Sequence, residues 1–519
     1  MNKYDLRILQ TSDVHGYVYP RSYSTKEFEN TGVAQISTLI KSLRTNSTIL
    51  IDSGDTIQGS PLTYFQAKES TEVINPMALV NNYMKYDYIT IGNHEFNYGI
   101  EYLDSYLKYI NSEVLNSNII NTNTSEPIYG NPYKIIDVKN GPKIAIIGVT
   151  THYIPNWEQP KHIENITFLD AYTTLKKEVK HVKEIENPDF IIVNYHGGFE
   201  RDFQTFELTT EDTGENQGSK MLKEIEGIDL LLSGHQHRTL AGELFGTLYT
   251  QPSLNGQGLG LIDINFTFED GIWIHSPKNI EILSTEGIVP DQDLLDVIDS
   301  YEEKTQIFLD KFIGKMDKDL IINDQLEARL NKHPLVSFMN HVQLEFSTAD
   351  ISSCSLGNTV SGFRKNITVR DVIGTFIFPN TLVVKEVPGS ILKRALEKAA
   401  EFFELENGLP IFSPKFNSPK LQLYAYDMYD GINYTIDIRK PVGNRVSNIT
   451  YKDKLIDPKT NYSIVMNNYR AAGGGDHLFF RDCKTLQDIQ LDIIELLISY
   501  IYDKKEIIVI DLKNIKIIY

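Results

Sequence analysis

Apolar runs that end in polar and glycine residues recur through the first half of the chain. These runs are rich in Ile, Leu and Val, are separated by stretches with helical periodicity, and cover residues 6–11, 48–51, 88–91, 143–149, 190–193 and 228–232. Short runs of this kind are typical of buried strands, and buried strands that alternate with helices predict a layered α/β domain. Ligands of such domains gather on loops beyond the strand ends, so the polar residues there form the candidate site.

The polar residues that follow these runs have the composition of a metal site. Five separate loops supply Asp13-Val-His15, Gly54-Asp55, Gly92-Asn93-His94-Glu95, His196 and Gly234-His235-Gln236-His237. Imidazole and carboxylate groups are suitable ligands for divalent first-row metal ions. A carboxylate can bridge two ions, and alternate residues in Asp-x-His and His-x-His can point to the same side. The set therefore predicts two metal ions rather than one.

Each of these motifs also has a structural interpretation when it is taken alone. A His at a strand end is more often a hydrogen-bonded structural or surface residue than a ligand, and Asn93 would suit the cap of a helix. Because five motifs recur in chain order at the same structural position, the metal interpretation is favoured for the set.

Two glycine patterns do not predict nucleotide-binding loops. The segment from Gly54 to Ser60 has P-loop spacing, but no Lys precedes the Ser. The glycines at 256, 258 and 260 are not followed by a convincing helix, so we expect a turn between strands there rather than a dinucleotide fingerprint.

The pattern changes at about residue 290. A chain of 519 residues is too long for one ordinary domain, and residues 291–311 read as a long, charged helix that connects two parts. We expect domains at 1–289 and 323–519 with a connector at 290–322. Within the second half, the sequence predicts helices at 334–345 and 389–405, and strands at 434–439 and 462–466.

Composition narrows the possible partners. The net charge of −19, from 50 Lys and Arg against 69 Asp and Glu, opposes binding to long nucleic acids or anionic membranes. No stretch approaches the roughly 18 to 20 apolar residues of a membrane span. The start of the chain does not read as a signal peptide, which predicts a cytoplasmic protein; a secreted or cell-surface location is the alternative if a leader has been removed.

Taken together, the motifs resemble the calcineurin-like metallophosphoesterase signature, and the whole chain is similar to the two-domain 5′-nucleotidase family. The segments that begin at Gly54, Gly92 and Asn467 are similar to the branch of 2′,3′-cyclic-nucleotide 2′-phosphodiesterases/3′-nucleotidases. The resemblance implies an α/β fold, with an N-terminal four-layer αββα metallophosphoesterase sandwich and a C-terminal α/β substrate domain of the 5′-nucleotidase type. A long helix would join the two.

The resemblance also implies how the ligands divide between two divalent ions, for which Mn²⁺, Zn²⁺ and Co²⁺ are all suitable. One ion would be held by Asp13, His15, Asp55 and His237, and the other by Asp55, Asn93, His196 and His235. His94 is then left over, so we expect it to contact the phosphate and to act in catalysis beside Asn93. Glu95 is expected to be a partner of these residues rather than a ligand.

The expected chemistry is hydrolysis without a covalent intermediate. Two ions would neutralise the phosphate and lower the pKa of a bridging water, which supplies hydroxide. His94 would stabilise or protonate the leaving ribose oxygen. In related 5′-nucleotidases this His pairs with an Asp three residues later, but here the residue is Asn97. An Asn can orient the ring without holding it as imidazolium by charge, and the cyclic-nucleotide branch resembles this sequence in carrying Asn.

The second domain is expected to bind the nucleoside, because aromatic rings stack on base faces. Tyr469, beside an Ala-Ala-Gly-Gly-Gly segment, looks like one stacking residue of the family; Phe378 is the expected second, and Asp476 would bind ribose hydroxyls. The Asn-Gly-Gly-x-x-Arg segment of 5′-nucleotidases is not found, and residues 358–364 take its approximate place.

These observations predict an enzyme that hydrolyses small nucleotides, with 2′,3′-cyclic nucleotides and 3′-nucleotides as substrates. The alternatives are a 5′-nucleotidase or UDP-sugar hydrolase, or a catalytically silent nucleotide-binding protein. The native metal, the base preference and the oligomeric state, monomeric or otherwise, stay open at this point.

Overall fold

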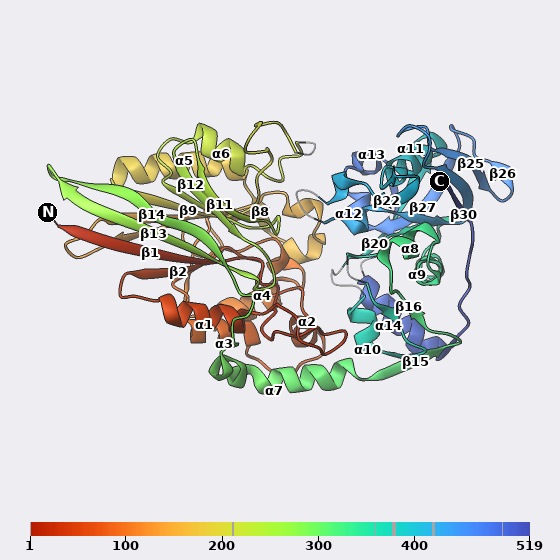
Figure 1. Cartoon of the computed structure of the whole chain (residues 1–519), viewed down its shortest axis with the longest axis horizontal. Helices are drawn as coiled ribbons and strands as arrows, with labels where there is room; N and C mark the ends of the chain where they lie inside the picture. Colours follow the sequence, from red (N-terminus) through yellow and green to blue (C-terminus); the bar gives the residue numbers. More distant parts are fainter. Residues whose placement is uncertain (1, 210–211, 359, 376–379, 418–420, 490) are drawn as a thin grey trace. The chain divides into compact units, whose positions relative to one another are not determined.

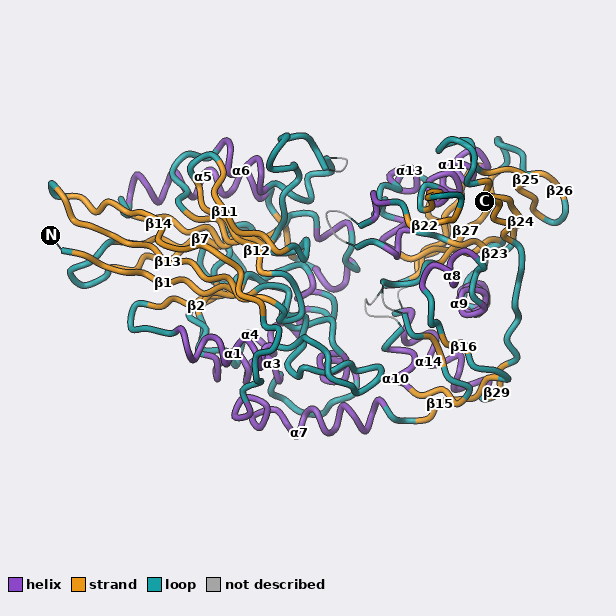
Figure 2. Tube along the Cα trace, in the orientation of Figure 1, coloured by secondary structure: helices purple, strands orange, loops and turns teal. Residues whose placement is uncertain are grey.

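The computed structural model describes residues 2–209, 212–358, 360–375, 380–417, 421–489 and 491–519. The chain divides into two compact units, Met1–Thr305 and Gln306–Tyr519. Figure 1 follows both units from the N-terminus in red to the C-terminus in blue, and Figure 2 marks their helices and strands. The boundary falls within helix α7 (Gln292–Leu309), where the sequence predicts a long helix.

Two six-stranded mixed sheets form the centre of the N-terminal unit. The first has the order β14-β13-β1-β2-β3-β4, and the second has the order β11-β12-β10-β9-β7-β6. Strands β1 to β4 run parallel, as do β7, β9, β10 and β12. Their bounds are β1 (Lys3–Thr11), β2 (Thr48–Asp52), β3 (Tyr88–Ile89), β4 (Glu113–Val114), β6 (Tyr133–Asp137), β7 (Lys143–Thr150), β9 (Phe190–His196), β10 (Leu230–Ser233), β11 (Thr239–Leu244), β12 (Thr247–Pro252), β13 (Gly258–Glu269) and β14 (Ile272–Ser284).

Strand β7 shows why the apolar runs are continuous. Its residues Ile144 and Ile146 pack in the core between the two sheets, whereas Ala145 and Ile147 pack on the opposite side, against helices α5 (Ala171–Ile185) and α6 (Gly218–Glu224). Successive side chains of a strand point to opposite faces, so a strand covered on both faces is apolar throughout.

Helices cover the outer face of each sheet. The other helices of this unit are α1 (Val33–Leu43), α2 (Pro61–Lys68), α3 (Pro76–Met84) and α4 (Ile100–Leu107), and α1, α3 and α4 lie on the outer side of the first sheet (Figure 1). The unit is therefore the expected four-layer αββα sandwich. Short strands β5 (Ile119–Asn121) and β8 (Ile166–Phe168) pair with each other outside the two sheets.

The predicted buried runs are confirmed as strands, and they lie in β1, β2, β3, β7, β9 and β10. The turn expected around the glycines at 256 to 260 is only partly correct. Gly256 has a positive φ of 76° in a turn, but Gly258 and Gly260 lie inside strand β13. A Cβ at Gly260 would stand 3.0 Å from the Cβ of Gln10 on β1, so a close approach of two strands uses that glycine.

The C-terminal unit is also mixed α/β, with a five-stranded sheet ordered β23-β17-β27-β20-β28, a four-stranded sheet ordered β26-β25-β24-β30 and a three-stranded sheet ordered β19-β15-β29. The strands of these sheets are β15 (Phe312–Met316), β17 (Ile351–Cys354), β19 (Asn366–Thr368), β20 (Leu382–Pro388), β23 (Met428–Asp430), β24 (Ile432–Asp437), β25 (Val446–Tyr451), β26 (Lys454–Leu455), β27 (Asn461–Asn467), β28 (Lys484–Ile489), β29 (Glu506–Ile507) and β30 (Ile515–Ile518). Its helices are α8 (Gln325–Leu330), α9 (Pro334–Glu345), α10 (Val369–Ile373), α11 (Gly389–Ala400), α12 (Asn468–Ala471), α13 (Leu478–Arg481) and α14 (Ile493–Lys504).

One predicted helix of this unit is too long. The sequence predicts a helix over 389–405, but α11 ends at Ala400, and β21 (Phe403–Glu406) pairs with β22 (Leu409–Phe412). The two strands are joined by Asn407 and Gly408, whose φ values of 51° and 80° suit a tight hairpin turn. A local Asn-Gly turn therefore overrides helical periodicity there. Strands β16 (Leu320–Ile321) and β18 (Gly362–Phe363) form a further small pair.

Among the residues that the structure describes, no helix has the length and apolar character needed to cross a membrane.

Candidate metal centre

Two groups of metal-ligating side chains meet at the ends of the parallel strands of the N-terminal unit. The first group is Asp13, His15 and His237, and the second is Asp55, His196 and His235. Within each group the nearest ligand atoms of the three side chains all lie within 4.8 Å of one another. The strand-end loops thus bring together residues more than 200 positions apart in the chain.

Hydrogen bonds at the rear of the first group leave ring lone pairs at its centre. His15 Nδ1 donates to the carbonyl of Gln58 at 2.9 Å, so its Nε2 carries no proton in the neutral ring. That Nε2 lies 3.0 Å from Nε2 of His237, which in turn lies 3.5 Å from Oδ1 of Asp13. Burial, together with the nearby His237, lowers the pKa of His15 to about 3, and the neutral imidazole is the form that binds metal.

The second group is arranged in the same way. His196 Nδ1 donates to the carbonyl of Ser53 at 2.7 Å, so its Nε2 faces Oδ2 of Asp55 at 3.2 Å and Oδ1 of Asn93 at 3.0 Å. His235 Nε2 donates to Oε1 of Glu215 at 2.8 Å, which leaves its Nδ1 facing the same Asn93 oxygen at 2.9 Å. Asn93 therefore belongs to this group through its carbonyl oxygen.

Acceptor atoms that face one another require positive charge between them. Oδ2 of Asp55 is buried and accepts no hydrogen bond from any residue that the structure describes. Burial lowers the pKa of His196, but the charge of Asp55 outweighs it and raises that pKa to about 10. A proton can supply part of the missing charge, whereas divalent ions satisfy all of these oxygens and nitrogens at once. The residues present therefore fit a dinuclear centre.

The backbone at the ligand residues is strained. Positive φ values of 53°, 49°, 60°, 70° and 59° occur at Asp13, His15, Asp55, His235 and His237. Non-glycine residues adopt this conformation at a cost of about 1 to 3 kcal/mol each, and such residues cluster at functional sites. Gly92 is required in the same region, because a Cβ there would stand 2.3 Å from Oδ1 of Asp55.

Glu95 holds two of the ligand loops through their backbone. Its carboxylate accepts hydrogen bonds from the backbone N–H groups of Asp55 at 2.9 Å, Thr56 at 2.5 Å and Gly92 at 2.7 Å. Burial raises the pKa of this carboxyl, and the charge of Asp55 adds to the effect. Glu95 therefore supports the centre, but it acts on the main chain and not on the ligand side chains.

His94 lies beside the first group and is oriented by Asn97. Its Nδ1 is 2.6 Å from Oδ1 of Asn97, and its ring centroid is 5.2 Å from that of His15. Its backbone N–H donates to Oδ1 of Asp55 at 2.8 Å. Asn97 therefore orients the ring, and the Asp55 carboxylate holds the backbone of the same residue.

Comparison with known proteins assigns this arrangement to a family. The calcineurin-like phosphoesterase model matches residues 6–239, and the model of the 5′-nucleotidase C-terminal domain matches residues 312–482. A Staphylococcus aureus protein provisionally described as a 5′-nucleotidase, crystallised in complex with alpha-ketoglutarate, is 34% identical to this chain; the match covers 99% of this chain and 100% of that one, with a TM-score of 0.89. The chain belongs to the 5′-nucleotidase family.

Two further relatives share less sequence identity with this chain. The 2′,3′-cyclic-nucleotide 2′-phosphodiesterase/3′-nucleotidase of Salmonella typhimurium is 27% identical over 91% of this chain and 82% of its own length. The trifunctional nucleotide phosphoesterase protein YfkN of Bacillus subtilis is 26% identical over 97% of this chain, but the match spans only 38% of that longer protein. The chain is therefore a metal-dependent phosphoesterase of the nucleotidase family.

Two residues that contact the centre, Glu215 and Trp157, could not be predicted from the sequence. Glu215 accepts from His235, as described above, and the ring of Trp157 lies 5.5 Å from the ring of His235 at an angle of 31°. A carboxylate that accepts from a metal-binding His fixes its tautomer and raises its basicity. Glu215 lies in a polar loop and Trp157 in an irregular segment, so neither stands out from its neighbours.

The C-terminal unit places Tyr469 and Asp476 on one segment. Tyr469 is half-buried on α12, and a Cβ at Gly474 would stand 2.5 Å from its ring, so the glycine loop packs closely against the aromatic side chain. Asp476 is exposed and accepts from Nζ of Lys398 at 3.1 Å. Phe378, the other expected stacking residue, lies outside the described residues.

A buried ion pair, which the sequence does not reveal, fixes the loop that follows Tyr469. Nε of Arg470 donates to Oδ2 of Asp427 at 2.8 Å, its Nη2 donates to Oδ1 at 3.2 Å, and its Nη1 donates to the carbonyl of Gly474 at 2.9 Å. Both side chains are buried.

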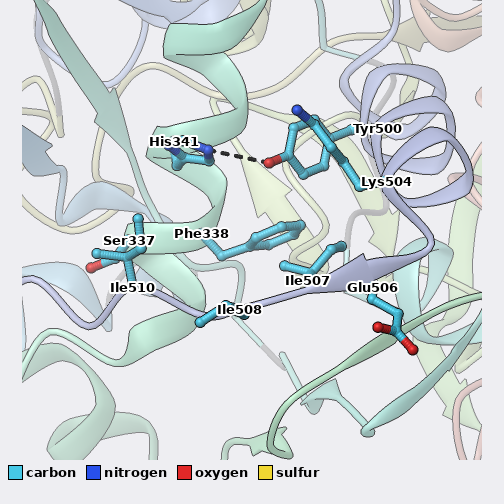
Figure 3. A pocket seen from close by; sticks show the side chains of 9 residues that line it. All are labelled: Ser337, Phe338, His341, Tyr500, Lys504, Glu506, Ile507, Ile508 and Ile510. Atoms are coloured by element: carbon cyan, nitrogen blue, oxygen red, sulfur yellow. Dashed lines mark hydrogen bonds between the residues drawn. The ribbon is translucent and has the colours of Figure 1, made fainter.

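This unit also has a hollow between α9, α14 and residues 506–510, where His341 Nε2 lies 3.2 Å from the hydroxyl of Tyr500 (Figure 3). Neither Tyr469 nor Asp476 lines that hollow.

Proposed function

We propose that this chain hydrolyses phosphoesters of small nucleotides, and that 2′,3′-cyclic nucleotides and 3′-nucleotides are its preferred substrates. The observation that carries the proposal is the convergence of lone pairs from two groups of Asp, Asn and His side chains, with His94 beside them. The net charge of −19 supports small nucleotides over long nucleic acids.

The pairing of His94 with Asn97 supports the choice of the cyclic-nucleotide branch. The family resemblance implies that an Asn at this position marks that branch, and that an Asp marks 5′-nucleotidases. The relative from Salmonella typhimurium that carries the cyclic-nucleotide name, 27% identical to this chain, supports the same choice.

In the proposed reaction the chain's own residues bind, orient and transfer a proton. Asp13, His15, Asp55 and His237 would hold one divalent ion, and Asp55, Asn93, His196 and His235 would hold the other. When bound, the two ions neutralise phosphate charge and activate water at neutral pH. His94 keeps Nδ1 on Asn97 and uses Nε2, in the imidazolium form, to donate a proton to the leaving ribose oxygen. Glu95 keeps the loops of Asp55 and Gly92 in register during the reaction.

A second candidate function is 5′-nucleotidase activity. The Staphylococcus aureus protein with that provisional name is more similar to this chain, at 34% identity, than the relatives named for cyclic nucleotides. The two candidates share the metal centre and differ in how the nucleoside is presented to it.

A panel of substrates tests the proposal. The full chain, loaded with Mn²⁺, is assayed with 2′,3′-cyclic AMP, 3′-AMP, 5′-AMP and a UDP-sugar, with bis(p-nitrophenyl) phosphate as a general phosphodiester. We expect the highest kcat/KM for the first two nucleotides. Preference for 5′-AMP or the UDP-sugar supports the second candidate, and absence of hydrolysis by the metal-loaded protein indicates a nucleotide-binding protein without catalysis.

A further inference from the structure

A carboxylate that no motif predicts lies behind the His94–Asn97 pair. Asn97 Nδ2 donates to Oε2 of Glu158 at 2.6 Å, while Asn97 Oδ1 faces Nδ1 of His94, also at 2.6 Å. Glu158 stands 61 residues after Asn97, in the irregular segment between the short 3-10 helices Ile154–Asn156 and Pro160–Ile163. Its side chain is only 5% exposed. His94, Asn97 and Glu158 therefore form a chain of hydrogen bonds, which runs from the edge of the metal centre to a buried carboxylate.

Glu158 is held by two further donors. The backbone N–H of Gln159 and Nδ1 of His162 each donate to its Oε1, both at 2.8 Å. One carboxylate oxygen thus faces Gln159 and His162, and the other faces Asn97. The carboxylate acts only as an acceptor here, because Gln159, His162 and Asn97 all donate hydrogen bonds to it.

The fixed carboxylate determines the direction of each hydrogen bond up to His94. An ionised carboxylate can only accept, so the amide of Asn97 must present its NH₂ group to Glu158 and its oxygen to His94. An amide oxygen also can only accept, so Nδ1 of His94 must carry a proton. Nε2 is then the ring nitrogen that exchanges a proton with the substrate.

Asn97 needs such a partner to fix the orientation of its side-chain amide, because the oxygen and the NH₂ group are nearly equal in size and shape. A rotation of half a turn about the terminal side-chain bond exchanges the oxygen and the NH₂ group, and this torsion is roughly two-fold. The rotated amide would present N–H to His94 and would place the proton of the neutral ring on Nε2. An Asp at this position would have no such ambiguity, since both of its oxygens accept.

We propose that Glu158 is a positioning residue of the active site, which locks the amide of Asn97 and thereby holds His94 with a proton on Nδ1 and with Nε2 as its proton-transfer atom. The proposal rests on the proposed function, because it deepens the role given there to His94. The carboxylate that an Asp would supply directly is supplied here one hydrogen bond further back.

The Glu158→Gln variant reverses this direction with almost no change in shape. The oxygen of the new amide is required by the two donors from Gln159 and His162, so its NH₂ group turns to Asn97. Asn97 must then rotate, and His94 loses its acceptor. We expect kcat for the nucleotide substrate to fall about 10- to 100-fold, as for other partners that orient a functional His, with KM and bound metal little changed. Glu164→Gln, which changes an exposed carboxylate directly after the second 3-10 helix, is the matched control and should behave as wild type.

The second variant is Asn97→Asp, alone and combined with Glu158→Gln. Alone, it sets two carboxylates 2.6 Å apart and should lower activity. In the double variant the carboxylate at 97 accepts from both His94 and the new amide, so activity should rise above that of either single variant. A role of Glu158 in folding alone predicts no such rescue, and thermal unfolding of all four proteins measures that role separately.

A spectroscopic signal makes the test independent of turnover. The ¹⁵N shifts of the His94 ring, assigned by their loss in His94→Ala, should report a proton on Nδ1 in the neutral wild-type ring and on Nε2 in Glu158→Gln. The proposal is overturned if Glu158→Gln keeps the wild-type kcat, if the double variant is no better than both singles, or if the ring shifts are unchanged. If the metal-loaded wild type hydrolyses no substrate of the panel, the proposed function fails, and the ring shifts alone then decide the positioning role.

Discussion

The metal centre of the N-terminal unit and the Tyr469 loop of the C-terminal unit are built in different ways. In the metal centre, the functional side chains themselves stand on strained turns at strand ends, as at Asp13, Asp55 and His235. At the Tyr469 loop, the aromatic ring is placed by a buried Arg470–Asp427 pair and by a glycine contact. The functional side chains of the metal centre therefore belong to short sequence motifs, whereas the position of Tyr469 depends on packing between segments that are distant in sequence.

Loss of the ligand that is proposed to hold both ions should remove both metal binding and activity from the metal centre. In Asp55→Ala the carboxylate that is proposed to hold both ions is gone, and metal ions contribute several kcal/mol of transition-state stabilisation. We therefore expect kcat/KM for the best substrate of the panel to fall at least about 10³-fold, together with loss of bound metal measured by elemental analysis. Chelation of the wild type should have the same effect and should be reversed by Mn²⁺. A chelated protein that keeps its rate would contradict the dinuclear assignment.

His94→Ala separates catalysis from metal binding in the same region. We expect kcat to fall by about 10² to 10⁴, the usual range for a general acid or base, while metal content stays at the wild-type value. His181→Ala on helix α5, outside the centre, is the control. Near-normal turnover in the His94 variant would remove this residue from the mechanism.

Glu215→Ala tests a support that lies outside the motifs. Its carboxylate accepts from Nε2 of His235, and loss of such a partner lowers metal affinity by about 10- to 100-fold. Titration of the chelated protein with Mn²⁺ should show this weaker binding, and the rate should recover at high metal concentration. An unchanged titration would mean that His235 needs no fixed tautomer.

Tyr469→Ala should give the smallest effect and the one most specific to the second region. Base stacking contributes about 1 to 3 kcal/mol, so we expect a rise in KM for nucleotides and little change for bis(p-nitrophenyl) phosphate, which has no base. Tyr469→Phe keeps the ring and should restore KM. If KM of the Ala variant equals that of the wild type, Tyr469 is a packing residue of the glycine loop.

The strand-end motifs were predictable because two local signals coincide in them. A buried apolar run ends where the sheet ends, and the residues that follow, such as Asp13 and His196, must turn and face the same edge. The Asn407-Gly408 hairpin was missed because helical periodicity before it continues into the strand, although the turn signal itself is present. No comparable signal exists for Glu215 or Asp427, which are single acidic residues among 69.

By itself, the sequence predicted the chemistry of the centre: which loops bring candidate ligands together, which side chains they offer, and that two ions suit them better than one. Only the tertiary structure decided how those atoms are oriented. The proton of His15 is placed by the carbonyl of Gln58, that of His196 by the carbonyl of Ser53, and that of His235 by Glu215. The physical reason is that the identity of a donor or acceptor is a property of one residue, whereas the direction of a hydrogen bond depends on a partner that folding brings from elsewhere in the chain.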